Sequence, residues 1–226
     1  LDILSNHKQD FLRHFGIDLE LARVCSRDPQ PAISRGLQDL FTDDYHDIIN
    51  DPEIDIVIEL IGGTGVAKDV IKEALSAGKQ VITANKAIMA SAGEEIMNLA
   101  EEKGVEIAFE ASVGGGIPII DPLKHSLIAN RIDSIMGIVN GTTNYMLSRM
   151  DEDGLDYDTA LKEAQERGFA EADPTADVDG LDAAAKIAIL ASIAFNSRVT
   201  MDQVYTEGIR RISPVDLAMA HDSGYV

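Results

Sequence analysis

The sequence predicts an α/β protein with a Rossmann-like doubly wound parallel sheet and a second α+β domain. Strand-like and helix-like segments alternate over residues 54–111, and short glycine-rich turns separate them. The pattern changes after residue 111, and from residue 157 onward it is mostly helical. The simplest division therefore places a nucleotide-binding domain at residues 1–111 and a second domain at residues 112–226.

Each element of the first domain follows from local patterning. Apolar residues at helical spacing predict a helix over residues 3–15, with Gly16 at its C-cap. Residues 19–25 alternate like a strand, and residues 54–61 form a continuous β-branched run typical of a buried parallel strand. After GGTG at 62–65, the pattern predicts a helix ending at Gly78, a strand at 80–84, a helix at 88–103 and a strand at 105–111.

The second domain has fewer strands. Residues 112–121 lead into a helix that extends to about residue 128, and residues 132–139 predict a strand. The segment NGTTNYMLSRM begins another helix, with Thr142 or Thr143 near its cap. Helices then dominate to the end of the chain, apart from one acidic loop.

Composition limits the classes of partner. The net charge of −20 argues against nucleic acids and anionic membranes, because both are bound mainly through lysine and arginine. No apolar run approaches the length of a membrane span, and a single cysteine fits a reducing compartment, so we expect a cytoplasmic protein. The chain starts at Leu1, near the first helix of the expected fold, and lacks the G-x-G-x-x-G turn that precedes such a helix. We therefore expect residues to be missing upstream.

The most informative stretch is ERGFAEADPTADVDGLDAAAK at 166–186. A cluster of acidic residues runs directly into a helix so apolar that it must be buried, and this helix carries one lysine, Lys186. Asp182 and Lys186 are four residues apart and share a helical face. A lysine in an apolar helix needs a partner or a chemical role. The stretch predicts a polar substrate pocket with a proton-transferring lysine at its base.

Three predicted turns should converge at the carboxyl ends of the parallel strands, where ligands of such sheets bind. They are GGTG at 62–65, ANK at 84–86 and ASVGGG at 111–116. Small residues would let a cofactor approach the backbone, and Lys86 would offer a charge to a phosphate or a substrate. Ordinary tight turns with a solvated Lys86 are the alternative.

Other chemistries fit less well. Cys25 lies within a predicted strand rather than at its carboxyl end, which argues against a nucleophilic thiol and against oxidation through a thioester. The five histidines lack metal-ligand spacing. The spaced aspartates of the acidic loop suggest calcium, but Pro174 interrupts them and no bidentate glutamate follows.

Several motifs together resemble the homoserine dehydrogenase family. They are IELIGGT, VITANKA, EASVGGGIPII, GIVNGTTNYML and GFAEADPTADVDGLDAAAKIAIL, and the resemblance covers the whole chain. It implies an NAD(P)-dependent oxidoreductase that interconverts L-homoserine and L-aspartate 4-semialdehyde in threonine, methionine and isoleucine biosynthesis. It also implies a homodimer formed through the second domain.

The resemblance implies a role for each matching position. Lys186 and Lys86 correspond to catalytic lysines, of which Lys186 exchanges the proton of the reacting oxygen. Substrate-binding carboxylates are implied at Glu171, Asp177 and Asp182. Contacts to the cofactor are implied at Gly62, Gly63, Thr64, Lys86 and Gly168. Backbone carbonyls that bind a monovalent cation, sodium or potassium, are implied at Glu110, Val113, Gly115 and Ile117.

Two questions stay open at the level of sequence. Arg27 follows the strand predicted at residues 19–25, where arginine favours the 2′-phosphate of NADP over NAD, although Asp28 lies next to it. A truncated, inactive chain that keeps only the substrate and dimer domain is the alternative to an active enzyme. Another semialdehyde-handling dehydrogenase is disfavoured by the position of Cys25.

Overall fold

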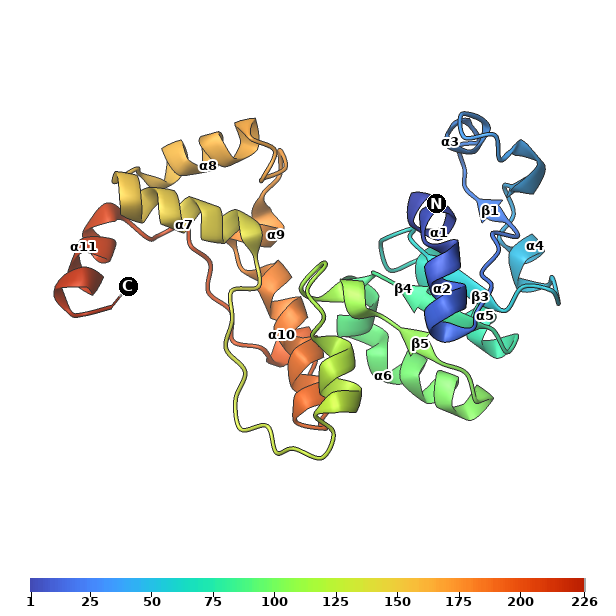
Figure 1. The fold of residues 1–226 in the computed structure, drawn as a ribbon. Helices are drawn as coiled ribbons and strands as arrows, with labels where there is room; N and C mark the ends of the chain where they lie inside the picture. The colour runs from blue at the N-terminus through green and yellow to red at the C-terminus, as the bar shows by residue number, and fades with distance from the viewer. Residues whose placement is uncertain (226) are drawn as a thin grey trace.

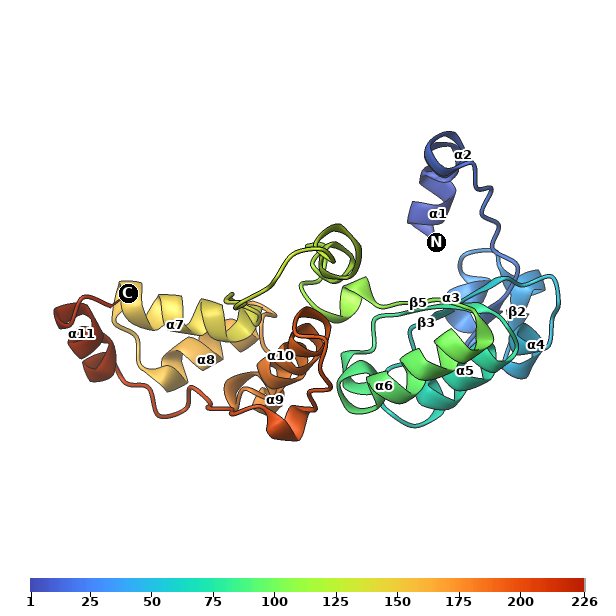
Figure 2. The ribbon, with the colours of Figure 1, turned by 90° about the horizontal axis from the view of Figure 1, so that it is seen from below.

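The computed structural model describes residues 1–225 and shows an elongated α/β molecule (Figure 1). The parallel strands lie at one end with α5 and α6 beside them, helices α7, α8 and α11 lie at the other end, and α10 lies between them (Figures 1 and 2). No helix in the described part of the chain combines the length and apolarity needed to cross a bilayer.

The helices before residue 65 are short, and most of those after it are longer, whereas the strands are short throughout. The α-helices are α1 Asp2–Asn6, α2 Lys8–Phe15, α3 Gln30–Ile33, α4 His46–Ile49, α5 Val66–Ser76, α6 Lys86–Lys103, α7 Gly141–Asp153, α8 Tyr157–Glu166, α9 Thr175–Val178, α10 Leu181–Ala194 and α11 Pro214–Asp222. The strands are β1 Val24–Cys25, β2 Phe41–Thr42, β3 Ile56–Glu59, β4 Gln80–Thr83 and β5 Ile107–Ala108. Short 3₁₀ or π turns cover Gln38–Leu40, Glu110–Ser112, Pro122–Ser126 and Met201–Gln203.

Two parallel sheets form the nucleotide-binding type of architecture. Strands β3, β4 and β5 pair in that order, and β1 pairs with β2. The crossover helices α5 and α6 bury the face that carries Val57 and Val81, while Ile58 and Ile82 on the other face are about half exposed. This topology confirms the predicted α/β fold with a parallel sheet.

Helix α10 is packed into the core of the sheet-bearing end. The larger apolar cluster contains residues of strands β3, β4 and β5 and of helices α5 and α6. Ala185, Ile189 and Leu190 of α10 pack into the same cluster. A smaller cluster joins α7 and α8 through Met146, Met150 and neighbouring alanines. The site residues of α10 are therefore anchored on the same core as the sheet.

Some predicted strands are shorter than expected or do not form. The strand expected at 19–25 contains only Val24–Cys25, and the one expected at 105–111 contains only Ile107–Ala108. The strand expected at 132–139 is wrong, because this segment has no partner strand among residues 1–225. Met136 and Ile138 on it are 94% and 78% exposed. A strand exists only where a neighbour completes its ladder, which a single-segment pattern does not reveal.

Helix termini are governed by side-chain caps. Asn140, rather than Thr142 or Thr143, caps α7, because its Oδ1 accepts from the backbone N of Thr143 at 2.8 Å. Asn85 caps α6 in the same way through the N of Ile88, so this helix begins at Lys86 and not at residue 88. Both caps lie next to lysine or carboxylate groups of the candidate site.

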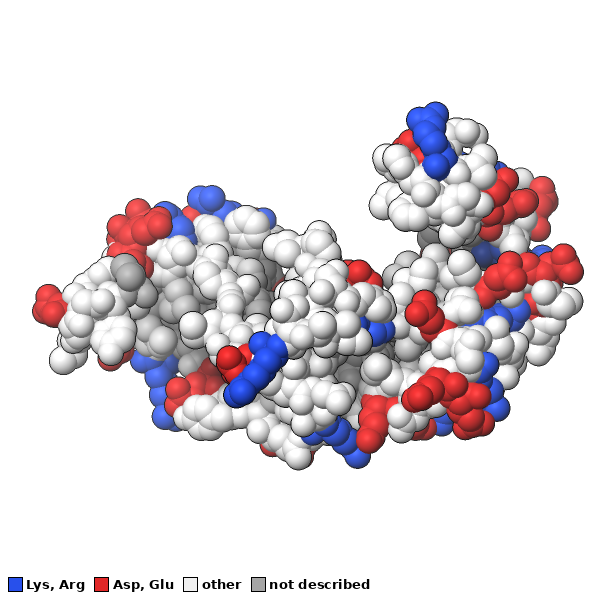
Figure 3. All heavy atoms as spheres, turned by 60° about the horizontal axis from the view of Figure 1, so that its bottom comes forward, with Lys and Arg blue, Asp and Glu red and all other residues white. Residues whose placement is uncertain are grey.

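The surface reflects the acidic composition. Figure 3 shows one face on which acidic side chains form several clusters, many of them at the end that holds the sheets. Basic side chains are scattered between them. This surface is consistent with the net charge of −20.

Candidate active site

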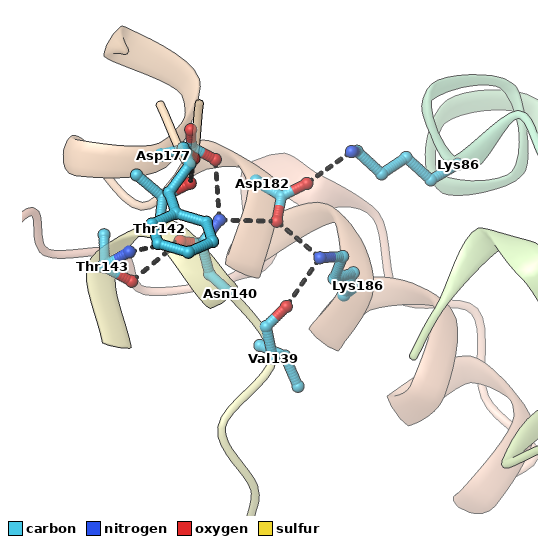
Figure 4. Close-up of polar contacts among 9 residues, drawn as sticks. Lys86, Val139, Asn140, Thr142, Thr143, Asp177, Asp182 and Lys186 are labelled. Atoms are coloured by element: carbon cyan, nitrogen blue, oxygen red, sulfur yellow. Dashed lines mark hydrogen bonds and ion pairs between the residues drawn. The ribbon is translucent and has the colours of Figure 1, made fainter. Parts of the chain in front are cut away.

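The centre of the candidate site is the buried carboxylate of Asp182 (Figure 4). Its Oδ2 lies 2.6 Å from the Nζ of Lys186, and its Oδ1 lies 2.5 Å from the Nζ of Lys86. Lys186 also donates to the backbone carbonyl of Val139 at 2.6 Å. One carboxylate thus bridges two ammonium groups from distant parts of the chain.

Local structure explains how these groups meet. Asp182 and Lys186 project from the same face of α10, as their spacing predicts. Lys86 is the first residue of α6 and follows β4 directly. Their side chains differ in exposure: Asp182 is 6% exposed, Lys186 is 17% exposed and Lys86 is 44% exposed. A ligand could therefore reach the two lysines more readily than the aspartate.

Asp182 is held in its ionised form. Burial alone would raise the pKa of its carboxyl group, but hydrogen bonds from Lys186, Lys86 and Asn140 outweigh burial and lower the pKa below its usual value. The carboxylate is therefore negative at neutral pH and keeps its attraction for both ammonium groups.

Asn140 joins two of the predicted carboxylates. Its Nδ2 donates to Oδ1 of Asp177 at 2.7 Å and to Oδ2 of Asp182 at 2.9 Å. Asn140 is not among the site residues predicted from the sequence. Its only local signal is an asparagine directly before a helix, which indicates a cap and says nothing about the two aspartates.

The turns after β3 and β4 are tied together. Glu59, which is 2% exposed, accepts from the hydroxyl of Thr83 at 2.6 Å and from the backbone N of Ile61 and Gly62 at 2.6 and 3.2 Å. Asn85 donates to the carbonyl of Gly63 at 2.7 Å. The turns at 62–65 and 84–86 therefore lie side by side, and Lys86 lies where they meet.

The third turn, at residues 111–116, is stabilised by Glu110. The carboxylate of this residue accepts from the backbone N of Ile119, Ile120 and Asp121 at 2.5 to 2.8 Å. Burial raises its pKa, but these three donors outweigh burial and lower it. The Glu110 side chain thus holds the segment that follows the turn.

The four carbonyls implied as cation ligands lie on this turn. Gly114 and Gly115 have φ angles of 81° and 60°, which only glycine adopts readily, so the chain changes direction between Val113 and Ile117. The carbonyl of Glu110 accepts from the N of Val113 at 3.3 Å. No cluster of three histidine, cysteine, aspartate or glutamate residues suited to a metal occurs within residues 1–225.

Three predicted residues are not connected to Asp182. Glu171 is exposed, and within the described chain its carboxylate has no hydrogen bond or ion pair to the lysines or to Asp182. Gly168 follows α8 with a φ of 77°, and Thr64 is exposed on the turn after β3. The structure therefore brings together Lys86, Lys186, Asp177 and Asp182, and leaves Glu171, Gly168 and Thr64 outside this network.

Cys25 is the last residue of β1, so it does lie at the carboxyl end of a strand. The premise used against it in the sequence analysis is wrong. A different property disfavours it as a nucleophile: burial, followed by the charges of Asp44, Asp43 and Asp47, raises the pKa of its thiol. A thiol with a raised pKa supplies little thiolate at neutral pH.

The acidic loop is buttressed by a distant segment. A Cβ at Gly208 would lie 2.5 Å from the carbonyl oxygen of Val178, and one at Gly180 would lie 2.8 Å from the carbonyl oxygen of Glu207. The N of Ile209 donates to the carbonyl of Val178 at 2.8 Å. Close backbone packing thus fixes the start of α10 and the position of Asp182.

The molecule combines a parallel Rossmann-type sheet with a lysine–carboxylate cluster, which lies where the turns of the sheet meet a helical region. These features define a class of α/β proteins that bind ligands at the carboxyl ends of their strands. Sequence profiles narrow this class. The profile described as "Homoserine dehydrogenase, NAD binding domain" matches residues 1–110, and that described as "Homoserine dehydrogenase" matches residues 118–226. The chain belongs to the homoserine dehydrogenase family.

Individual relatives agree. The chain is 46% identical over 224 residues to a homoserine dehydrogenase of Pseudomonas aeruginosa, covering 99% of this chain and 51% of the relative. It is 55% identical over 188 residues to one of Synechocystis sp., covering 83% and 43%. The chain thus spans about half the length of the curated relatives it matches.

Solved structures show the same similarity. A homoserine dehydrogenase from Thiobacillus denitrificans matches with a TM-score of 0.92 and 43% identity, covering 98% of this chain and 52% of that one. A putative homoserine dehydrogenase from Archaeoglobus fulgidus matches with a TM-score of 0.87 and 34% identity, covering 100% and 73%. A hyperthermophilic archaeal homoserine dehydrogenase described in complex with NADPH matches with a TM-score of 0.79 and 28% identity, covering 93% and 71%.

Proposed function

We propose that the protein containing this chain interconverts L-homoserine and L-aspartate 4-semialdehyde in threonine, methionine and isoleucine biosynthesis. The single observation that carries the proposal is the bridge from Lys86 through Asp182 to Lys186. It lies where the turns of a parallel sheet meet the helical region. Membership of the homoserine dehydrogenase family supports the same activity.

The cofactor of this reaction would be a nicotinamide dinucleotide, which accepts or supplies the hydride when bound. The residues on the turn after β3 fit such a group. A Cβ at Gly62 or Gly63 would meet no atom within 4 Å, so open space lies against the backbone there. The cofactor contacts would come from Gly62, Gly63, Thr64, Lys86 and Gly168. Arg27, just beyond β1, favours NADP over NAD through the 2′-phosphate.

Lys186 would act on the reacting oxygen. In reduction its ammonium group donates a proton to the aldehyde oxygen, and in oxidation the neutral amine takes the proton of the hydroxyl group. Asp182 holds the amine in place at 2.6 Å, and Lys86 adds a second positive charge beside the oxygen. Because oxidation needs the neutral amine, alkaline conditions favour the oxidative direction.

The substrate would be held by its ammonium group. Glu171, Asp177 and Asp182 are the carboxylates proposed for this contact. Asp177 suits the role because no lysine, arginine or histidine forms an ion pair with it within residues 1–225. Its charge is therefore available to a cationic ligand.

The remaining features of the proposal concern the whole protein. Backbone carbonyls of Glu110, Val113, Gly115 and Ile117 would bind sodium or potassium, since neutral oxygen ligands suit hard cations. Residues 1–111 would form the nucleotide-binding domain and residues 112–226 the substrate-binding and dimerisation domain. We propose a cytoplasmic homodimer that binds neither nucleic acid nor membrane.

A spectrophotometric assay tests the activity. We expect the protein containing this chain to reduce NADP or NAD with L-homoserine, and Lys186→Ala to lower turnover by about a hundredfold to ten-thousandfold, as the loss of a general acid or base does. Affinity for the dinucleotide should stay nearly unchanged, because Lys186 acts on the substrate oxygen. Lys162→Ala, on an exposed face of α8, is the matched control and should behave like the parent.

Two outcomes would contradict the proposal. If the folded protein reduces neither NADP nor NAD in the presence of L-homoserine, the proposed activity is wrong and the truncated, inactive chain is favoured. Turnover of Lys186→Ala within about threefold of the parent would remove Lys186 from the mechanism.

A further inference from the structure

Asn140 uses every hydrogen-bonding group of its side chain. The two N–H groups of its amide donate to Asp177 and Asp182, and its Oδ1 accepts from both the backbone N and the hydroxyl of Thr143, at 2.8 and 2.9 Å. The partners fix the orientation of the amide, because the backbone N of Thr143 can only donate and the carboxylates can only accept. The residue is 9% exposed, so water competes little for these bonds.

An amide suits this position for a chemical reason. Asp177 and Asp182 are like charges that face the same nitrogen, and a neutral double donor can hold both without cancelling either charge. A lysine in its place would neutralise one carboxylate, and a hydroxyl group has only one proton to donate. The charge of Asp182 is already paired with the two lysines, so Asp177 is the carboxylate that keeps its charge for a cationic ligand, at a distance from Asp182 that Asn140 fixes.

The cap adds rigidity to this arrangement. Asn140 is the N-cap of α7, and this helix packs through Met146 and Met150 into the smaller apolar core. Asp177 lies on α9 and Asp182 lies on α10. One side chain therefore links three helices at the point where the carboxylates meet.

We propose that Asn140 is a positioning residue that sets the distance between Asp177 and Asp182 and so determines recognition of the substrate ammonium group. This role rests on the proposed function of the same site. Asn140 acts through the two carboxylates and not on the reacting oxygen, so its loss should affect the amino-acid substrate and leave the dinucleotide unaffected.

Two substitutions separate the bridge from the cap. Asn140→Ser keeps an oxygen that can cap α7 but removes the double donor, and Asn140→Asp also keeps the cap but sets a third carboxylate against the other two. In the protein containing this chain, we expect kcat/KM for homoserine to fall about 10- to 100-fold in Asn140→Ser, as the loss of a hydrogen bond to a charged group does, and further in Asn140→Asp. The Michaelis constant for the dinucleotide should change by less than about twofold.

A second cap provides the control. Asp156 caps α8 through the N of Thr159 at 2.8 Å, and it belongs to no part of the candidate site. Asp156→Ser should leave both Michaelis constants unchanged. Retention of parental kcat/KM for homoserine by both Asn140 variants, or an equal rise of both Michaelis constants, would overturn the proposal.

A measurement without turnover separates this proposal from the proposed function. Asn140→Asp should lower the melting temperature, and adding Asp177→Asn should restore much of the loss, because a donor then replaces one of the repelling carboxylates. Should the protein show no activity on homoserine, this rescue still decides whether Asn140 acts through the carboxylates. An equal loss of melting temperature with and without Asp177→Asn would overturn the inference.

Discussion

Asp182 carries one negative charge, and the ammonium groups of Lys86 and Lys186 lie on its two oxygens. This trio keeps one surplus positive charge. A surplus of that sign stabilises an oxygen that gains negative character as a carbonyl is reduced. Asp177, on the far side of Asn140, restores neutrality to the site as a whole.

The charge of Glu171 can be tested separately. We expect Glu171→Gln to raise the Michaelis constant for homoserine about tenfold or more, because a hydrogen bond to a charged group is worth about 1.5–3 kcal/mol. The constant for the dinucleotide should stay the same. Steady-state kinetics with each substrate varied in turn provides the measurement.

Glu166→Gln is the control for that substitution. Glu166 is the last residue of α8, its side chain is 67% exposed, and its Oε1 lies 3.9 Å from the Nζ of Lys162. Its replacement should leave both constants unchanged. Equal changes of the two constants in Glu171→Gln would exclude Glu171 from ammonium binding.

For individual residues, contacts could be predicted from the sequence only where two residues lie a few positions apart. The pair of Asp182 and Lys186 follows from a four-residue interval on one helix. The bond from Lys86 to Asp182 and the bridge through Asn140 depend on packing between α6, α7 and α10, and no local interval encodes that packing. The predicted convergence of the turns at the carboxyl ends of the strands placed Lys86 at the site, and the family resemblance gave it a catalytic role, whereas Asn140 had no such signal.

Among the elements, α5 and α6 are joined by a compact charge cluster. Glu95 on α6 lies 2.6 Å from Lys68 and 2.6 Å from Lys72, both on α5. Hydrogen bonds from these lysines lower the pKa of Glu95 from 4.5 to about 2. Its ionised form is therefore favoured in the folded protein.

This pair of helices should respond to acid in a predictable way. A carboxyl group with a lowered pKa stabilises the fold above its unfolded pKa of 4.5, and the contribution is lost as the pH falls through about 2. Glu95→Gln should therefore lower the free energy of unfolding slightly at neutral pH, and this difference from the parent should vanish in strong acid. Denaturant titrations at several pH values measure it.

The effect should be small, because Glu95 is 46% exposed and solvent screens such pairs. Glu101→Gln, at an exposed position of the same helix, is the control and should show no such pH dependence. A constant difference between Glu95→Gln and the parent at every pH would contradict the assigned charge interaction.

The helices α5 and α6 were predicted well and the short strands poorly, for a physical reason. The helix expected over residues 3–15 is divided at His7 into α1 and α2, and the one expected to reach about residue 128 is only the π turn Pro122–Ser126. The helix α5 shows its buried face in the sequence through Val70, Ile71 and Ala74, and Gly104 marks the end of α6. A helix satisfies its own backbone, so its local pattern is sufficient. A strand needs a neighbour, and the segment at 132–139 shows that an apolar alternating pattern alone does not provide one.

At the scale of the molecule, α10 contributes to both the site and the core of the sheet-bearing end. Its Ile189 is 4% exposed and packs with residues of α5, α6 and the strands, whereas Ile187 on the same helix is 36% exposed. Figure 2 shows α10 beside α6 in the middle of the molecule. The proposed domain boundary near residue 111 therefore does not coincide with the boundary between the two apolar clusters.

Ile189→Ala should lower the stability of the folded protein. We expect it to lower the free energy of unfolding by about 2–5 kcal/mol, because it removes buried methyl groups and leaves a cavity. Ile187→Ala, which changes the same atoms at a more exposed position, should cost less. Equal losses in denaturant titrations of the two variants would show that α10 is not anchored through Ile189.

The buried side chain of Glu59 accepts hydrogen bonds from the backbone of the turn after β3. The backbone N–H groups of Ile61 and Gly62 point at this carboxylate, although free N–H groups in glycine-rich turns are what usually hold a phosphate. A phosphate placed against Ile61 and Gly62 would find these two N–H groups already engaged by Glu59. Under the proposed function, the open backbone at Gly62 and Gly63 would therefore suit an uncharged sugar or ring of the dinucleotide, and other groups would hold its diphosphate.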